Sequence, residues 1–140
     1  MILSAPATLL TAAVTLLAVL VALWTAILVA RARSRTGIKP PAVTGSPDLE
    51  CALRVQANTV EQFILFMPAL WVAAIYFQGW VPPIIGLIWC LGRILFALGY
   101  KAIKPTARAP GFALTILATL VLIVLGGIGI VLAWIAASAS

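Results

Sequence analysis

Residues 6–30, PATLLTAAVTLLAVLVALWTAILVA, carry no charged side chain and decide the fold class. An apolar helix of about 20 residues is long enough to cross the hydrocarbon core of a bilayer. A secretory signal peptide would place a basic segment ahead of a shorter apolar core, and this run has neither feature. The run therefore predicts a first membrane-spanning helix that stays in the protein.

Three more apolar runs follow, at residues 54–78, 82–103 and 111–137. Polar stretches with proline and glycine separate them and interrupt the helices. Of the 140 residues, 64% are apolar and 9% are charged, and the mean hydropathy is +1.21. Soluble domains are about half apolar and about a quarter charged, so a water-soluble globule is excluded. We predict one domain over residues 1–140, an all-α membrane protein built as a bundle of four transmembrane helices.

The basic residues favour one side of the membrane. With four spans, the first and third connections lie on one side, and the termini and the second connection lie on the other. The positive-inside rule assigns the basic side to the cytoplasm and so predicts both termini on the non-cytoplasmic side. Because these charges rim a membrane, we expect contact with anionic lipid and no nucleic-acid partner. The basic residues on the predicted cytoplasmic side are Arg31, Arg33, Arg35, Lys39, Arg54, Lys101, Lys104 and Arg108.

Residue types that are missing or rare exclude several kinds of active site. The chain has no histidine and two cysteines, Cys51 and Cys90. Without histidine there is no His-based catalytic triad and no His-ligated metal site. Two cysteines are too few for a zinc–thiolate site. We therefore expect no metal site of these kinds.

Polar side chains recur at helical spacing inside the second and third apolar runs. Arg54, Asn58 and Glu61 stand at i, i+4 and i+7, which places them on one helix face. Arg93 and Tyr100 repeat the i, i+7 spacing and form a second stripe on the next helix. Ionisable groups at membrane depth are costly, and they usually face a bundle interior or a wet cavity. Both stripes point toward the predicted cytoplasmic half.

Two interpretations of these stripes stay open from spacing alone. Glu61 and Arg93 can neutralise each other in an ion pair that fixes the register of the two helices. Alternatively, the stripes form a site for a small, net-anionic ligand with carboxylate and ammonium groups. Arginines would bind the carboxylates, Glu61 would bind the ammonium group, and Asn58 would hydrogen-bond an amide. The second interpretation also accounts for Arg54 and Tyr100.

The motif R-x-Q-x-N-x-x-E at residues 54–61, followed by R-x₆-Y at residues 93–100, resembles the MAPEG family. This family comprises membrane-associated proteins in eicosanoid and glutathione metabolism. The likeness covers residues 30–108, and residues 33–47 look most like its leukotriene-C synthase and microsomal glutathione transferase branch. The resemblance implies a homotrimer of four-helix bundles that binds glutathione in the cytoplasmic half, between neighbouring subunits.

The resemblance also implies a function, with glutathione as co-substrate and no separate cofactor. The protein would conjugate the glutathione thiolate to lipophilic electrophiles, and the same thiolate could reduce hydroperoxides. Arg108, with Tyr100 as a second candidate, would stabilise the thiolate. The residues implied to contact glutathione are Arg54, Asn58, Glu61, Arg93, Tyr100, Gln56 and Arg33.

Three positions depart from the leukotriene-C synthase pattern and keep other functions open. Gln62 and Phe96 stand where tyrosines are expected. Ala107 aligns with the arginine credited with activating the thiol, and Arg108 is its neighbour. A non-catalytic membrane scaffold would keep the fold and lose the chemistry. A small four-helix membrane transporter is a further alternative, in which Glu61 would bind a proton or a cation.

Overall fold

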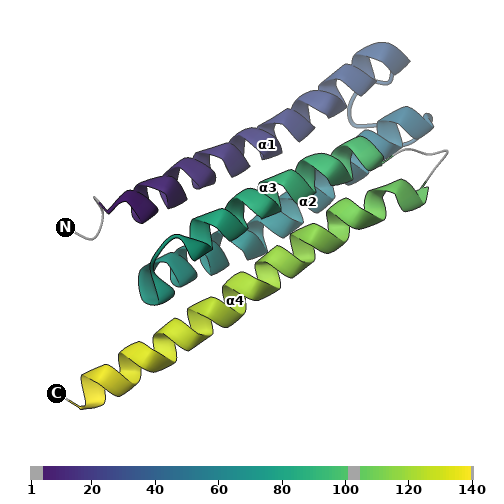
Figure 1. Ribbon diagram of the computed structural model, residues 1–140. Helices are drawn as coiled ribbons and strands as arrows, with labels where there is room; N and C mark the ends of the chain where they lie inside the picture. Colours follow the sequence, from purple (N-terminus) through teal and green to yellow (C-terminus); the bar gives the residue numbers. More distant parts are fainter. Residues whose placement is uncertain (1–4, 101–104, 140) are drawn as a thin grey trace.

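The fold is a bundle of long helices, seen in the computed structural model of Figure 1. The structure describes residues 5–100 and 105–139, and in these ranges it has helices and short connections but no strand. Four of the described helices are long and apolar enough to cross a membrane, which confirms the predicted all-α fold class. The elements are α1 (Pro6–Thr36), α2 (Pro47–Val72), the π-helix η2 (Ala73–Phe77), α3 (Val81–Gly99), the 3-10 helix η3 (Pro105–Arg108) and α4 (Ala109–Ser138).

Figure 1 shows the four long helices side by side, with both termini at one end of the bundle. The connection between α1 and α2 lies at the other end, together with the end of α3 and the start of α4. The topology prediction requires this arrangement, because it gathers the basic connections at one end. Lys101 and Lys104, which belong to that prediction, lie outside the described residues. Which side of the membrane this end faces stays a prediction.

The connection between α1 and α2 spans residues 37–46, so it is shorter than the polar stretch between the apolar runs predicted at residues 6–30 and 54–78. Charged residues mark where the chain leaves the hydrocarbon, but they do not end a helix. Helix α1 ends at Thr36, because the next residue, Gly37, has a left-handed φ of 70° and donates its N–H to the carbonyl oxygen of Arg33 in the last turn. Helix α2 begins at Pro47, because proline suits the first helical position and Asp48 favours the positive end of the helix dipole.

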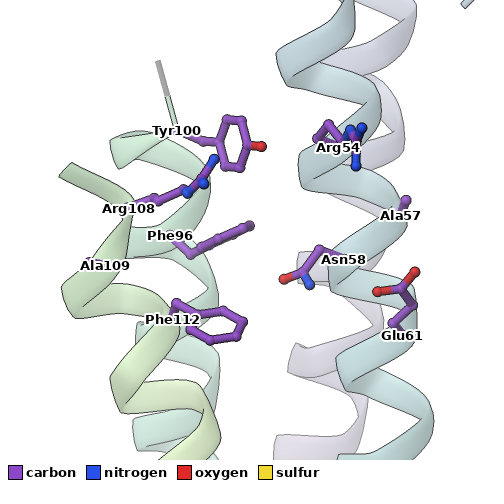
Figure 2. A pocket seen from close by; sticks show the side chains of 9 residues that line it. All are labelled: Arg54, Ala57, Asn58, Glu61, Phe96, Tyr100, Arg108, Ala109 and Phe112. Carbon is purple, nitrogen blue, oxygen red and sulfur yellow. The ribbon is translucent and has the colours of Figure 1, made fainter. Parts of the chain in front are cut away.

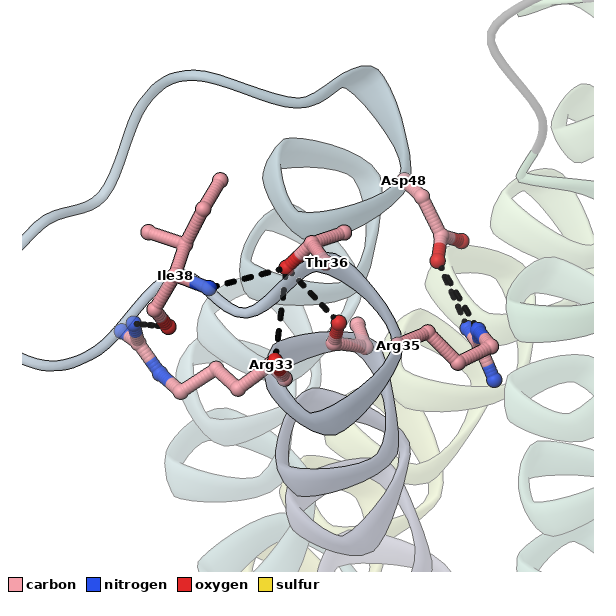
Figure 3. A network of polar contacts seen from close by, with 6 residues as sticks. Arg33, Arg35, Thr36, Ile38 and Asp48 are labelled. Atoms are coloured by element: carbon pink, nitrogen blue, oxygen red, sulfur yellow. Dashed lines mark hydrogen bonds and ion pairs between the residues drawn. The ribbon is translucent and has the colours of Figure 1, made fainter.

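Side-chain contacts hold this connection against the helix ends (Figure 3). Arg35 forms an ion pair with Asp48, with 2.8 Å between Nη2 and Oδ2. Arg33 donates from Nη1 to the carbonyl oxygens of Ile38 and Ala42, at 3.3 and 2.9 Å. The end of α1 and the start of α2 are therefore tied together just before the polar face of α2.

Helix α3 ends at Gly99, earlier than the predicted end at residue 103. Tyr100 already has an extended backbone, with φ −79° and ψ 90°. A side chain at Gly99 would overlap the carbonyl group of Ala107. The glycine therefore lets η3 pack directly on the end of α3, which brings the start of α4 close to Tyr100.

The core lies between the helices that frame the candidate site. Trp89 of α3 is fully buried and stacks on Phe66 of α2, with 4.1 Å between the ring centroids. Helices α3 and α4 approach closely, because a Cβ atom at Gly111 would overlap the backbone of Phe96. Close-packed interiors resist small displacements. Helices α3 and α4 therefore form one wall, and α2 faces it.

Candidate functional site

The candidate site is a pocket between α2 and the wall formed by α3 and α4 (Figure 2). Its volume is about 370 Å³, within the range of about 300–1,000 Å³ that is usual for small-molecule sites. It lies at the end of the bundle where α2 begins and α3 ends. The lining residues are Arg54, Ala57, Asn58 and Glu61 from α2, Phe96 from α3, Tyr100 directly after α3, Arg108 from η3, and Ala109 and Phe112 from the start of α4.

Helix α2 brings three of the predicted residues to one side of the pocket. Arg54, Asn58 and Glu61 all line it, as the i, i+4 and i+7 spacing predicts for one helix face. Arg54 and Glu61 are exposed, and Asn58 is half-buried. In Figure 2, Asn58 points toward the aromatic side chains of the opposite wall, and Glu61 lies farther round the helix. This wall therefore offers a cation, an anion and an amide.

The opposite wall is aromatic and carries one cation. The rings of Phe96 and Tyr100 meet edge-on, with 5.4 Å between their centroids. The guanidinium carbon of Arg108 lies 4.5 Å from the centroid of the Tyr100 ring, an arrangement typical of a cation–π contact. Phe112 lies beside Phe96, with 6.1 Å between the centroids. The two predicted catalytic residues are therefore in contact, across the connection between α3 and α4.

Arg93 lies behind the pocket and is not part of its surface. Its side chain is fully buried, and it donates to Oδ1 of Asn58 at 3.1 Å and to Oγ1 of Thr59 at 2.8 Å. Within one chain Arg93 therefore contacts Asn58 and not the pocket surface, and its expected contact with glutathione stays a prediction. The ion pair of Glu61 with Arg93 is also wrong, because in the described part of the chain the salt bridge is between Arg35 and Asp48.

Gln56 and Arg33, the other two predicted residues, lie away from this pocket. Gln56 lines a wider neighbouring hollow, together with Val43 and Thr44 of the connection between α1 and α2. Arg54 borders both hollows. Arg33 is engaged with carbonyl oxygens of the connection. Within one chain, the structure brings five of the eight predicted site residues to a single pocket, namely Arg54, Asn58, Glu61, Tyr100 and Arg108.

Phe112 is a lining residue that the sequence analysis missed. It is 40% exposed and borders the pocket on the side of α4. It follows Arg108 at i+4, a spacing that places both residues on one helix face. That spacing could have indicated that Phe112 lines the same site as Arg108. From sequence alone, however, an aromatic residue inside a long apolar run cannot be told from a side chain that faces the membrane.

The sequence of this chain matches the model of a known protein family. The model of the MAPEG family matches residues 11–128, which is most of the sequence. The chain belongs to the MAPEG family. The match confirms the resemblance carried by residues 54–61 and 93–100. It also agrees with the four apolar helices, because residues 11–128 include most of α1 and most of α4.

Individual MAPEG relatives match over most of their length. The chain is 37% identical to microsomal glutathione S-transferase 2 of Homo sapiens over 119 residues, 85% of this chain and 80% of the relative. It is 37% identical to leukotriene C4 synthase of Cavia porcellus over 102 residues, 73% of this chain and 68% of the relative. An uncharacterised protein of Synechocystis sp. is 46% identical over 113 residues, 81% of this chain and 82% of the relative.

Of the three positions expected to depart from the leukotriene-C synthase pattern, two lie outside the pocket. Gln62 is 8% exposed and faces the interior of the bundle. Ala107 is exposed in η3 and does not line the pocket. Phe96 lines the pocket and is the departure that changes its surface. The polar wall on α2 holds Arg54, Asn58 and Glu61, three of the residues on which the resemblance rests.

The described residues show no arrangement typical of a metal site. Among residues 5–100 and 105–139, no three histidine, cysteine, aspartate or glutamate side chains come together as metal ligands would. Cys51 is half-buried, Cys90 is buried, and both are free thiols. The expectation that the protein uses neither a metal nor a redox cofactor stays a prediction.

Proposed function

We propose that this MAPEG protein is a membrane-bound transferase that joins glutathione to lipophilic electrophiles. One observation carries the proposal: a single pocket combines the polar face of α2 with Tyr100 and Arg108. Glutathione has two carboxylates, an ammonium group, two peptide bonds and a thiol, and the pocket has a partner for each kind of group. The identity of 37% to a microsomal glutathione S-transferase supports the same activity.

The polar face of α2 matches glutathione in length as well as in charge. Arg54 can bind a carboxylate through two parallel N–H···O bonds, and Glu61 can accept from the ammonium group. The helix rises about 1.5 Å per residue, so these two residues are about 10 Å apart along α2. An extended tripeptide also spans about 10 Å. Asn58 lies between them and can hydrogen-bond the middle of the ligand.

Thiol activation is assigned to Arg108. A free cysteine thiol has a pKa of about 8.5, so only a few per cent is thiolate at neutral pH. Lowering that pKa by about two units requires roughly 2.7 kcal/mol of preferential stabilisation of the thiolate. An arginine in a partly desolvated site supplies energy of this order. The guanidinium of Arg108 meets this need at the pocket wall, and the hydroxyl of Tyr100 is a second donor.

The reaction is a nucleophilic attack by the thiolate. Its sulfur forms a bond to an electrophilic carbon, and the leaving group departs with the electron pair of the broken bond. A hydroperoxide would instead be reduced to an alcohol in two steps. The thiolate first takes one oxygen as a sulfenic acid, and a second glutathione then gives the disulfide and water. Phe112, 40% exposed at the pocket edge, provides apolar contact for an acceptor that arrives from the bilayer.

The proposed assembly is a homotrimer in which a neighbouring subunit covers the open side of the site. Glu61 is exposed in the single chain, although it belongs to a membrane-spanning helix. A carboxylate at membrane depth is costly unless protein or a wet cavity surrounds it. The hollow lined by Gln56 also shares Arg54 and Glu61, and it gives a neighbour a surface next to the pocket.

The proposed active site faces the cytoplasm. The pocket lies at the end of the bundle where the basic connections gather. The positive-inside rule assigns that end to the cytoplasm. This is also the compartment in which glutathione keeps thiols reduced, so the co-substrate is present on that side.

A conjugation assay tests the proposed function. Protein purified in detergent is mixed with glutathione and a chromogenic aryl halide, and the rate of conjugate formation is measured. We expect turnover by the wild type and a loss of about 25-fold at pH 7 in Arg108→Ala, because the thiolate fraction falls from about three-quarters to about 3% when the pKa returns from about 6.5 to about 8.5. Arg31→Ala is the matched control, since Arg31 is exposed on α1 away from the pocket. It should keep the wild-type rate.

Three other results would contradict the proposal in different ways. No turnover together with no glutathione binding in calorimetry would overturn it altogether. Glutathione binding without turnover on any electrophile or hydroperoxide would indicate a membrane scaffold. Proton-coupled dye efflux from vesicles, lost in Glu61→Gln, would indicate a transporter.

A further inference from the structure

Arg93 makes its contacts behind the wall of the pocket. Its side chain is fully buried, and it does not line the pocket. Nη1 donates to Oδ1 of Asn58 at 3.1 Å, and Nη2 donates to Oγ1 of Thr59 at 2.8 Å. The guanidinium carbon lies 4.2 Å from the centroid of the Phe96 ring. Three contacts therefore hold the guanidinium in one place between α2 and α3.

The hydrogen bonds around Arg93 form a chain in which each group donates to the next, starting from the guanidinium. Thr59 accepts from Arg93 and donates its own hydroxyl proton to the carbonyl oxygen of Val55, at 2.7 Å. The arginine is thus anchored to the backbone of α2 through Thr59. Hydrogen bonds in which one partner is charged are stronger than neutral ones. The anchored guanidinium therefore provides a fixed donor at Asn58.

This fixed donor determines which end of the Asn58 amide faces a ligand. An asparagine side chain has an oxygen that accepts and an amino group that donates. Arginine has five N–H donors and no acceptor, so it can bind Asn58 only through the oxygen. With Oδ1 turned to Arg93, the Nδ2 amino group is left for the pocket that Asn58 lines.

We propose that Arg93 is a positioning residue that fixes the orientation of Asn58, so that the pocket presents a hydrogen-bond donor at this point. The inference rests on the proposed function and specifies one recognition step within it. Asn58 then binds an oxygen of glutathione, either a peptide carbonyl or a carboxylate, and not a peptide N–H group. Arg93 itself does not touch the ligand.

A double-mutant cycle tests this inference. Glutathione affinity is measured by calorimetry on the full-length protein in detergent, for Arg93→Gln, Asn58→Ala and the double variant. Glutamine can accept as well as donate, so it no longer fixes the amide. We expect each single change to weaken binding about tenfold, and the double variant to bind no more weakly than Asn58→Ala. Independent losses that multiply in the double variant would mean that Arg93 contacts glutathione directly, and would overturn the inference.

Conservative variants separate positioning from a structural role. Arg93→Lys keeps a donor-only, charged group and should bind glutathione within about threefold of the wild type. Arg93→Gln should raise KM for glutathione and leave kcat at saturating glutathione within about threefold. Thr59→Val removes the anchor of Arg93 and leaves its bond to Asn58, so glutathione affinity should fall, but by less than in Arg93→Gln. Loss of binding in Arg93→Lys as severe as in Arg93→Gln would contradict the inference.

A final variant decides the question even if Arg93→Gln does not fold. Asn58→Asp has nearly the same shape, keeps an acceptor for Arg93 and presents only acceptors to the pocket. We expect it to bind glutathione more weakly than Asn58→Ala. Equal or tighter binding than Asn58→Ala would overturn the inference while leaving the proposed function in place. A wild-type protein that binds no glutathione would instead overturn the proposed function, and this inference with it.

Discussion

At the scale of single residues, the proposed chemistry depends on how Arg108 is held. Its guanidinium rests on the ring of Tyr100, and that ring meets Phe96 edge-on. Phe96 is buried, so this stack is anchored in the protein interior. A cation over an aromatic face is stabilised by about 0.5–2 kcal/mol, depending on desolvation. The ring of Tyr100 therefore contributes to the site separately from its hydroxyl group.

Two substitutions of Tyr100 distinguish these contributions. Tyr100→Phe keeps the ring and removes the hydroxyl, and we expect its conjugation rate to stay within about threefold of the wild type. Tyr100→Leu removes the ring, and we expect a loss of about tenfold, because a cation–π contact of about 1.4 kcal/mol is lost. The rates are measured with the aryl halide at saturating glutathione. A loss in Tyr100→Phe as large as in Tyr100→Leu would show that the hydroxyl is the essential group.

At the level of single residues, the sequence predicts which side chains share a helix face but not how deeply each is buried. Helical spacing could predict that Arg54, Asn58 and Glu61 share a face, since that is a property of one helix. Spacing does not report depth, and Arg93 lies fully behind the pocket, whereas Tyr100, directly after the end of the same helix, lines it. The contact of Arg108 with Tyr100 crosses a connection, so no periodicity could have indicated it.

At the scale of elements, the pocket depends on the close approach of α3 and α4. Gly111, in the first turn of α4, lies so near to Phe96 that an added Cβ atom would overlap its backbone. Arg108 and Phe112 flank this glycine along the chain, and both line the pocket. The position of the aromatic wall therefore depends on this one contact.

A pair of glycine substitutions on α4 tests that dependence. Gly111→Ala should lower the unfolding temperature in detergent by about 5 °C, because overpacking costs about 1–3 kcal/mol. It should also weaken glutathione binding, since α4 must shift away from α3. Gly127→Ala is the matched control on the same helix, because an added Cβ there meets no atom within 4 Å. Equal unfolding temperatures for the two variants would contradict this account of the wall.

Helix ends were the least predictable feature at this scale. The apolar run indicates an end near Ala30, but α1 continues to Thr36. A helix can extend into water as long as its backbone N–H and C=O groups are hydrogen-bonded. Its actual end is set by the left-handed backbone of Gly37. The end of α3 at Gly99 likewise depends on a contact with Ala107 of a later element.

At the scale of the whole molecule, the pocket and the basic connection between α1 and α2 lie at the same end of the bundle. The four spans could be predicted from the sequence, because membrane-spanning helices need long apolar runs. Both termini lie at one end of the bundle, and the pocket lies at the other (Figure 1). The orientation in the membrane follows from the basic connections by the positive-inside rule. It is a prediction that the helices alone do not determine.

Reporter fusions in a bacterial host test that orientation. An alkaline phosphatase that is active only outside the cytoplasm should be active when it is fused after the last residue, Ser140. The same reporter fused after Thr44, in the connection between α1 and α2, should be inactive. A green fluorescent protein at the same two positions should give the reverse result and serves as the control. Active phosphatase at Thr44 would place the pocket on the non-cytoplasmic side.

The most direct test of the central claim is a pH titration of glutathione bound to the purified protein, followed by the ultraviolet absorbance of the thiolate. If the pocket holds glutathione and Arg108 stabilises its thiolate, the pKa of the bound thiol lies about two units below the free value of about 8.5 in the wild type. In Arg108→Ala it returns close to the free value. A bound thiol that titrates like free glutathione in the wild type, or that is unchanged in Arg108→Ala, would contradict the claim.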